Sequence, residues 1–231
     1  MTGITIKYCQ TWDDSRKRVN RFLKEKGYLG DEQPTIILNF VEDDIIVDDN
    51  ILVLNRFVEL IRDKILMNKL LDKFEIPHPL TYYYPFANLP KTPDDCVVKT
   101  QYGQEGKRIK FQTFLTIDRD ELQDYNYVQA YIPFEKEYRV LVDFLGTFSI
   151  KEKVGEAKLK NSKSCKFRKR ENQEIATFAT QVCRKFGIDF AGLDIGEWNG
   201  KYYIIELNSA PCLSTKNAEI FANHLIGILY R

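Results

Sequence analysis

Apolar residues along the chain follow two spacings, which divide it into predicted strands and helices. Alternation with a period of two predicts strands, whereas apolar residues three and four positions apart predict amphipathic helices. By these patterns the chain begins with a strand at 3–8, a helix at 13–26 and a second strand at 35–40. This order predicts a short βαβ unit, and the acidic segment 42–49 after it is predicted to be a solvated loop.

A long helical pattern follows from residue 55 to residue 75, with apolar residues at intervals of three and four. It predicts one core-facing helix or a pair of helices. Pro77 and Pro79 end the pattern, because each proline restricts the residue before it to extended conformations. Further along, the patterns predict strands at 96–99, 127–132 and 135–150, the last with a turn near Gly146, and helices at 171–186 and 216–230.

Residues 191–213 form a predicted β-hairpin with its turn at 198–200. It contains three oxygen donors, Asp194 in the first strand and Glu206 and Asn208 in the second. Since side chains alternate along a strand, Glu206 and Asn208 point to the same face. Two carboxylates and an amide carbonyl suit a hard cation such as Mg2+, and the alternative is an ordinary sheet with polar residues on its solvated face.

The metal interpretation depends on the turn of this hairpin. A two-residue turn sets Asp194 opposite Ile205, on the face away from Glu206. A three-residue loop at 198–200 instead pairs Asp194 with Ile204, so that Asp194 and Glu206 are diagonal neighbours about 7 Å apart. We therefore predict a three-residue or bulged turn, and a regular two-residue turn without a bulge would contradict the metal site.

Composition and charge exclude several classes of protein. A hydrophobic fraction of 44% with 13% aromatic residues can form a globular core. The formal net charge of +1 does not favour nucleic acid or a membrane surface as a partner, and no apolar run approaches the ~20 residues of a membrane span. The five cysteines are scattered and never spaced as Cys-x-x-Cys, which argues against a disulfide framework or a zinc site and favours the cytoplasm.

Two segments are candidates for contact with phosphates. The strand at 96–99 leads Lys99 into a loop with Gly103 and Gly106, where backbone N–H groups can approach an anion closely. A G-x-x-G spacing is equally typical of an ordinary hairpin loop. The stretch 158–170 has seven basic residues and no acidic one, which fits a polyanion-binding segment, a loop that covers phosphates, or a solvated surface.

Seven short motifs follow one another between about residue 63 and residue 213. They are, in order, Asp63-Lys64 with Ile76-Pro77-x-Pro79; Val97-Val98-Lys99 with Gly103 and Gly106; Val128-Gln129-Ala130-Tyr131-Ile132; Glu137-Tyr138-Arg139; Lys160-Asn161; Asp194 with Glu206 and Asn208; and Asn208-Ser209-Ala210-Pro211. In this order they resemble the ATP-grasp superfamily, most closely its RimK-like glutamate ligases and glutathione synthetases. Each motif alone is weak, but seven in the correct order are hard to obtain by chance.

The resemblance implies roles for individual residues. ATP is expected to contact Lys64, Lys99, Gly103, Gly106, Gln129, Ala130, Tyr131 and Glu137. Of these, residues 129–131 would contact adenine through their backbone and Glu137 would bind the ribose. The residues expected beside the transferred phosphate are Arg139, Lys160 and Asn161. Magnesium is expected on Asp194, Glu206 and Asn208, with Mn2+ as the alternative metal.

The chain departs from the family pattern at three places. Ala130 stands where the family usually has an acid, although that contact is made largely by the backbone. Arg108 stands where a third glycine is common, so the loop is expected to be stiffer or to place a cation near the phosphates. The part before Lys64 is shorter than the usual preceding domain, which often supplies acceptor contacts.

The fold implied by the resemblance is α+β, with two α+β lobes that hold ATP between them. We expect a reduced α/β region at 1–55 and an ATP-grasp domain at 56–231. Within the domain, the first lobe is expected at about 75–132 and the second at about 133–231.

The implied reaction is the ATP- and Mg2+-dependent joining of a carboxylate and an amine through an acyl phosphate. The expected partners are a small or peptide carboxylate and an amine acceptor, with an acidic protein tail as one candidate because of the basic run at 158–170. An oligomer is compatible with the sequence. Two alternatives remain open, a kinase with the same fold and a nucleotide-binding or polyanion-binding module without catalysis.

Overall fold

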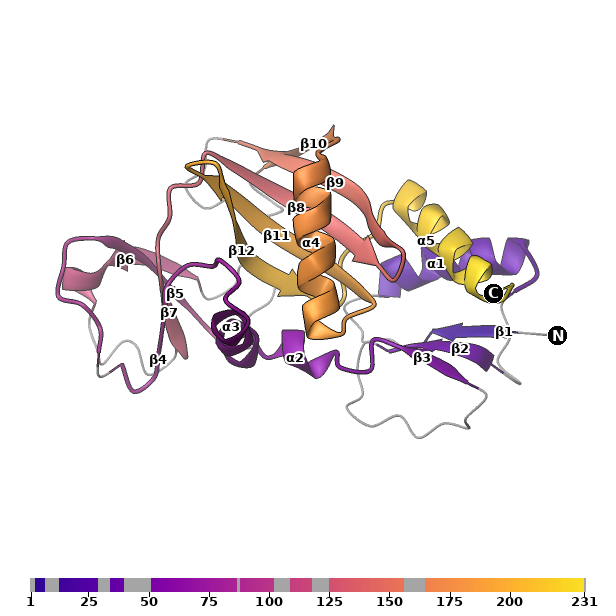
Figure 1. The fold of residues 1–231 in the computed structure, drawn as a ribbon, viewed down its shortest axis with the longest axis horizontal. Coiled ribbons are helices and arrows are strands. Elements are labelled where there is room, and N and C mark those ends of the chain that lie inside the picture. Colours follow the sequence, from indigo (N-terminus) through magenta and orange to yellow (C-terminus); the bar gives the residue numbers. More distant parts are fainter. Residues whose placement is uncertain are drawn as a thin grey trace.

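The computed structural model describes residues 3–6, 13–28, 34–39, 51–86, 88–101, 109–117, 125–155 and 165–230. These residues form three sheets, which Figure 1 shows one after another along the molecule. Expectations that fall between the described ranges, including the acidic segment 42–49 and the glycine loop after Lys99, lie outside them.

The first sheet is a parallel βαβ unit, as predicted. It contains β1 (Gly3–Ile6), β2 (Pro34–Leu38) and β3 (Leu52–Leu54), in that spatial order, and helix α1 (Asp13–Glu25) connects the first two. The third strand was not predicted, because three residues are too few for a periodic pattern. Helix α1 packs beside the C-terminal helix α5 (Thr215–Ile228), with Val19 and Leu23 in one buried cluster with Phe221 and Leu225.

The segment 55–75 is a pair of helices rather than one. Helix α2 (Glu59–Arg62) ends at Asp63, whose backbone is extended, and helix α3 (Lys64–Lys73) starts there. The carboxylate of Asp63 accepts hydrogen bonds from the N–H groups of Ile65 and Leu66, an N-cap that satisfies two groups of the first turn.

The second sheet has the order β4-β7-β5-β6 and forms the end of the molecule away from the termini. Its strands are β4 (Thr81–Tyr83), β5 (Asp95–Lys99), β6 (Lys110–Thr113) and β7 (Tyr127–Ala130), all paired antiparallel. The patterns predicted β5 and β7 but not the two edge strands. Lys99 ends β5 on the side of this sheet that faces α3.

The third sheet has five antiparallel strands in the order β10-β9-β8-β11-β12. They are β8 (Lys136–Asp143), β9 (Gly146–Val154), β10 (Lys166–Arg170), β11 (Phe190–Trp198) and β12 (Lys201–Asn208). The described end of the basic run, residues 166–170, is therefore a strand rather than a loop. All five of its side chains are exposed, so it offers no apolar alternation from which a strand could be predicted.

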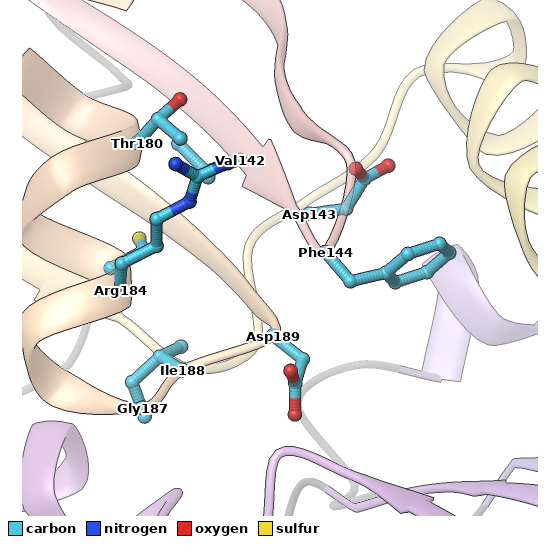
Figure 2. A pocket seen from close by; sticks show the side chains of 9 residues that line it. Val142, Asp143, Phe144, Thr180, Arg184, Gly187, Ile188 and Asp189 are labelled. Carbon is cyan, nitrogen blue, oxygen red and sulfur yellow. The ribbon is translucent and has the colours of Figure 1, made fainter. Parts of the chain in front are cut away.

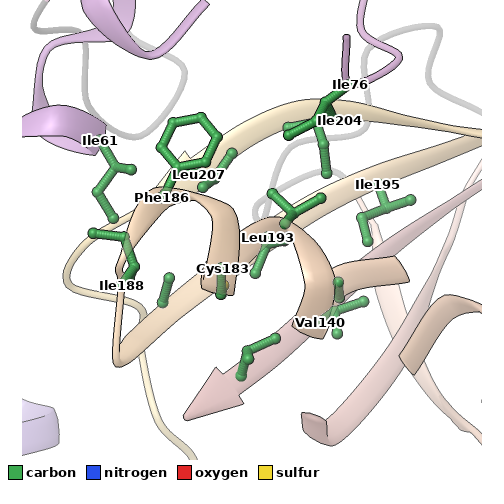
Figure 3. Close-up of a cluster of buried hydrophobic side chains, with 14 of the residues drawn as sticks. Ile61, Ile76, Val140, Cys183, Phe186, Ile188, Leu193, Ile195, Ile204 and Leu207 are labelled. Carbon is green, nitrogen blue, oxygen red and sulfur yellow. The ribbon is translucent and has the colours of Figure 1, made fainter. Parts of the chain in front are cut away.

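Helix α4 (Gln173–Phe186) covers one face of the five-stranded sheet (Figure 1). It ends at the predicted residue, because the left-handed Gly187, with φ of 65°, stops it, and it begins two residues later than predicted, after the N-cap Asn172. Beneath it lies the largest core, in which Phe186 and Cys183 of the helix meet Leu193, Ile195 and Ile204 of the sheet (Figure 3). At one end of the opposite face Leu141 and Phe190 pack against α5 in the second cluster, and the rest of that face has charged side chains.

Candidate functional site

The hairpin of β11 and β12 has a two-residue turn, so the predicted three-residue loop is wrong. Trp198 pairs with Lys201, and the turn consists of Asn199 and Gly200, with φ of 49° and 69°. Two successive left-handed residues are typical of the type I′ turn, which matches the twist of the flanking strands.

A bulge farther along the hairpin restores the pairing that a metal site needs. Ile195 pairs with Ile204, but the register shifts by one residue at the next position, and Asp194 pairs with Glu206. Ile205 is the extra residue of this bulge. Residues directly opposite each other share a face, so Asp194 and Glu206 now lie on the same side of the sheet, and the bulged form of the prediction is confirmed.

Asp194 lies at the centre of a buried charge cluster on that face. Arg139, its cross-strand neighbour on β8, donates two hydrogen bonds to the carboxylate, including Nη2 to Oδ2 at 2.9 Å. Lys153 on β9 places its Nζ 3.0 Å from Asp194 Oδ2 and 3.6 Å from Glu137 Oε2. Glu137 and Arg139 thus lie on one face of β8, as side-chain alternation along a strand requires.

The cluster sets the protonation state of its members. Burial alone would raise the pKa of Asp194, but Arg139 and Lys153 outweigh it and hold that pKa well below the usual range. Asp194 in turn raises the pKa of Arg139, against the effect of burial. Asp194 is therefore a carboxylate at every physiological pH, as a metal ligand must be.

The first lobe and the paired helices contribute two further lysines. Lys64, at the start of α3, is buried and lies 3.0 Å from Glu206 Oε1, and it also donates to the carbonyl of Leu207. Lys99, at the end of β5, donates to Gln129 Oε1. The amide nitrogen of Gln129 donates to Asn68 Oδ1 at 3.1 Å, which anchors the β7 side chain to α3.

Lys99 links the two sheets electrostatically. Burial lowers its pKa, while Glu206 and Asp194 raise it and Lys64 and Lys153 lower it further. These four charges come from α3, β9, β11 and β12, so the second and third sheets direct their charged side chains into one site. Residues far apart in the sequence thus meet there, as the resemblance implied.

The donor set at this site fits Mg2+. Asp194 and Glu206 offer carboxylate oxygens from paired positions, and Asn208 lies two residues beyond Glu206 on the same face. The amide nitrogen of Asn208 is buried and has no hydrogen-bond partner among the described residues. Since the two ends of an amide exchange by a flip, the side chain can present its oxygen there instead. Within the described chain no three His, Cys, Asp or Glu side chains gather as a metal site.

The expected adenine segment is partly committed to the second sheet. The N–H of Ala130 donates to Leu80 O and the N–H of Tyr131 donates to Asp95 O, both at 2.9 Å. The side chain of Gln129 is buried and accepts a hydrogen bond from Lys99, so it holds this lysine in place. The contact of residues 129–131 with adenine stays a prediction. Because the N–H groups of Ala130 and Tyr131 are already hydrogen-bonded, such a contact would use the backbone carbonyl groups.

Four expected site residues, Gly103, Gly106, Lys160 and Asn161, lie outside the described residues. One residue of the cluster, Lys153, was not predicted at all. Only 4% of its side chain is exposed, which is unusual for a lysine without a binding or pairing role. The predicted strand ended at residue 150, so the sequence showed neither that Lys153 belongs to β9 nor that it lies beside Asp194 of β11.

A separate cavity of about 230 Å³ lies at the other end of β8, between this strand and the C-terminal end of α4. Asp143 and Asp189 line it, and Figure 2 shows their carboxylates pointing away from each other. Each carboxylate has its own partner. Asp143 Oδ2 lies 2.5 Å from His224 Nδ1, and Asp189 Oδ2 accepts a hydrogen bond from the backbone N–H of Asn55 at 2.7 Å. The two acids therefore do not form a catalytic pair.

No protein-family model matches the sequence, and no curated protein matches it. Solved structures do resemble it. The ATP-grasp ligase PsnB, complexed with a minimal precursor, Mg and ADP, superposes with a TM-score of 0.69 at 14% identity, over 98% of each chain. A RimK domain ATP-grasp protein from Sphaerobacter thermophilus DSM 20745 gives 0.67 at 13% identity, over 96% of this chain and 99% of its own. The macrocyclase MdnC from Microcystis aeruginosa MRC, bound with precursor peptide MdnA, gives 0.67 at 12% identity, over 98% of this chain and 100% of its own.

These likenesses cover nearly the whole chain, and they show that it has the ATP-grasp fold, an α+β fold, as expected from its motifs. The reduced α/β region is included in the superposition, whereas the domain boundaries at 55 and 132 stay a prediction. Among the described residues no helix is both long and apolar enough to cross a membrane.

Proposed function

We propose that the protein is an ATP-dependent carboxylate–amine ligase. ATP would phosphorylate a substrate carboxylate to give an acyl phosphate and ADP, and attack by an amine would form the amide and release phosphate. The observation that supports this most is the cluster between the two lobes. Oxygen donors of the kind that Mg2+ prefers, Asp194 and Glu206, face each other inside a ring of buried or half-buried cations.

The cations are suited to the charge that such a reaction moves. Phosphoryl transfer is promoted mainly by positioning and by neutralising charge on the phosphate oxygens. In the proposed complex Lys64 and Lys99 hold the phosphates from the first-lobe side, while Arg139 and Lys153 turn from Asp194 to the transferred phosphate. Asp194, Glu206 and Asn208 would hold magnesium, which would supply positive charge to neutralise the phosphates. No side chain is needed as a nucleophile.

The fold neighbours support this choice of substrates. PsnB is described as a ligase with Mg, ADP and a precursor, and MdnC as a macrocyclase with a precursor peptide. We infer by analogy that ATP and Mg2+ are the nucleotide and metal here, and that a peptide supplies the carboxylate or the amine.

The test is Glu206→Ala, with Glu219→Ala on the exposed side of α5 as the matched control. Glu206 is about one-third exposed and faces the site, so its loss should abolish ATP turnover and the rise in melting temperature caused by Mg2+ and ATP, without unfolding the protein. The control should keep both. Full ADP production by Glu206→Ala would refute the proposed metal site.

Product analysis separates the ligase from the alternative kinase. The full chain is incubated with ATP, Mg2+ and pooled amino acids and peptides, and products are identified by mass spectrometry. A ligase joins two substrates with loss of one water and releases ADP and phosphate. A stable phosphorylated product with ADP, and no amide, would establish the kinase instead.

A further inference from the structure

One row of cross-strand neighbours crosses all five strands of the third sheet on the face of the proposed ATP site. From β12 to β10 the row consists of Glu206, Asp194, Arg139, Lys151 and Lys169. Neighbours in such a row share a face and lie about 5 Å apart. The row therefore has two acids on β12 and β11, at the proposed metal site, and three bases on β8, β9 and β10.

Among the described residues, the outer two bases of this row have one exposed partner between them. Arg139 is bonded to Asp194, but Lys151 has no hydrogen-bond or ion-pair partner among the described residues. Lys169 has only Glu171 at 3.5 Å, in a pair whose side chains are 74% and 90% exposed. Such an exposed pair contributes little, and like charges in directly opposite positions destabilise a sheet. Folding alone gives no reason for this arrangement.

The other face of the same two strands is different. There Glu152 of β9 accepts from Arg168 at 3.3 Å and from Arg170 at 2.5 Å, so two of the three basic residues of β10 that point away from the site are paired. Lys166 also points to that face and has no pair among the described residues, so unpaired charge occurs on both faces. What distinguishes Lys151 and Lys169 is that they continue the row that starts at Glu206 and Asp194.

We propose that Lys151 and Lys169 bind acidic side chains of a peptide substrate whose reacting carboxylate lies at the Arg139 end of the row. This inference rests on the proposed function and names its carboxylate substrate. From Arg139 to Lys169 the row covers two strand spacings, about 10 Å. The two carboxylates of one acidic amino acid cover about one such spacing, so a peptide with several acids is needed to reach both lysines.

The test measures binding of a fluorescently labelled oligoglutamate peptide to the full chain by anisotropy, with Mg2+ and a non-hydrolysable ATP analogue at low salt. Wild type should bind this peptide and not oligoglutamine. The double variant Lys151→Gln/Lys169→Gln should bind it roughly tenfold more weakly, through the loss of two charge contacts. The matched control is Lys166→Gln, on the same strand but the opposite face, and it should stay within about twofold of wild type.

Three results would overturn the proposal. The double variant could bind oligoglutamate as tightly as wild type, or the control could lose as much affinity, which would mean that only overall charge matters. A single-stranded DNA oligonucleotide that binds through the same two lysines more tightly than oligoglutamate would assign the row to nucleic acid. Binding of the ATP analogue is measured in every variant. Its absence in wild type refutes the proposed function, whereas intact analogue binding with an unchanged peptide affinity refutes this inference alone.

Discussion

The buried cation Lys153 provides the sharpest test of the charge cluster. The change is Lys153→Met, which keeps the length and apolar stem of the side chain and removes its charge. The matched control is Lys151→Met, two residues earlier on the same strand and the same face, where no described residue is paired with the lysine. Both variants lose one positive charge, but Lys153 is buried and paired with Asp194 and Glu137, whereas Lys151 is half-buried.

The expected loss follows from these distances. Two unit charges 4 Å apart attract by about 4 kcal/mol at an effective dielectric constant of ~20, and breaking a buried pair costs about 3–5 kcal/mol because one charge stays buried. Asp194 keeps Arg139, and removing a buried lysine recovers its desolvation cost. We therefore expect Lys153→Met to lower the free energy of unfolding by about 2 kcal/mol, or the melting temperature by roughly 4–8 °C. Lys151→Met should stay within about 0.5 kcal/mol of wild type.

The pH dependence gives the sign of the effect. Since the folded-state pKa of Asp194 is lowered, its pairing contributes stability above the unfolded pKa near ~4 and loses it as the pH falls through the folded pKa. Lys153→Met makes that lowering smaller. The loss of stability should be full between about pH 5 and 8 and smaller at about pH 3.5, as measured by urea unfolding. Equal stabilities of the two variants at pH 7, or a loss that does not change with pH, would refute this account.

Two further predictions concern residues that hold the site in place. Asn55 is fully buried with φ of 57°, and its side chain makes three hydrogen bonds of 2.7–2.9 Å with the backbone of Asp189 and Phe190. Asn55→Ala should cost about 3 kcal/mol in urea unfolding and Asn55→Gly less, because glycine accepts positive φ without strain. A Cβ on Gly196 would lie 2.3 Å from the ring of Phe134. Gly196→Ala should therefore destabilise the protein by about 1–3 kcal/mol, measured as a lower melting temperature. Adding Phe134→Ala to this variant should recover part of the loss. If nothing is recovered, the clash with Phe134 is not the cause.

Much of the fold was predictable because local signals and long patterns agree. The boundaries of α4 follow from its apolar face, the Asn172 cap and Gly187. The break between α2 and α3 at Asp63 was open in the sequence, since the apolar pattern continues through it and only the carboxylate cap marks a new start. The strands β3, β4 and β6 were missed because three or four residues contain too little pattern, and their pairing with neighbours stabilises them.

The sequence predicted several of the residues that gather at the site, but it did not predict the contacts that these residues make with one another. Motif order brought Lys64, Lys99 and Arg139 together, and each does lie in the cluster. The resemblance could not assign Lys153, because a lysine on an alternating strand is usually exposed and only the pairing of β9 with β8 and the proximity of Asp194 bury it. Gln129 shows the opposite case, since its side chain braces Lys99 rather than facing a ligand.

The bulge at Ile205 explains why the predicted three-residue turn was wrong although Asp194 and Glu206 do share a face. Asn199-Gly200 is the strongest two-residue turn signal in the hairpin, and that turn alone would place Glu206 on the core face beneath α4. There its charge would be buried among apolar side chains at a cost of several kcal/mol, whereas one extra residue in the strand turns it to the polar face. A bulge between the turn and Glu206 therefore allows the preferred two-residue turn and also keeps the Glu206 carboxylate out of the apolar core. The bulge lies directly beside Asp194, so the extra residue Ile205 corrects the register at the point where Glu206 must face Asp194 to form the proposed metal site.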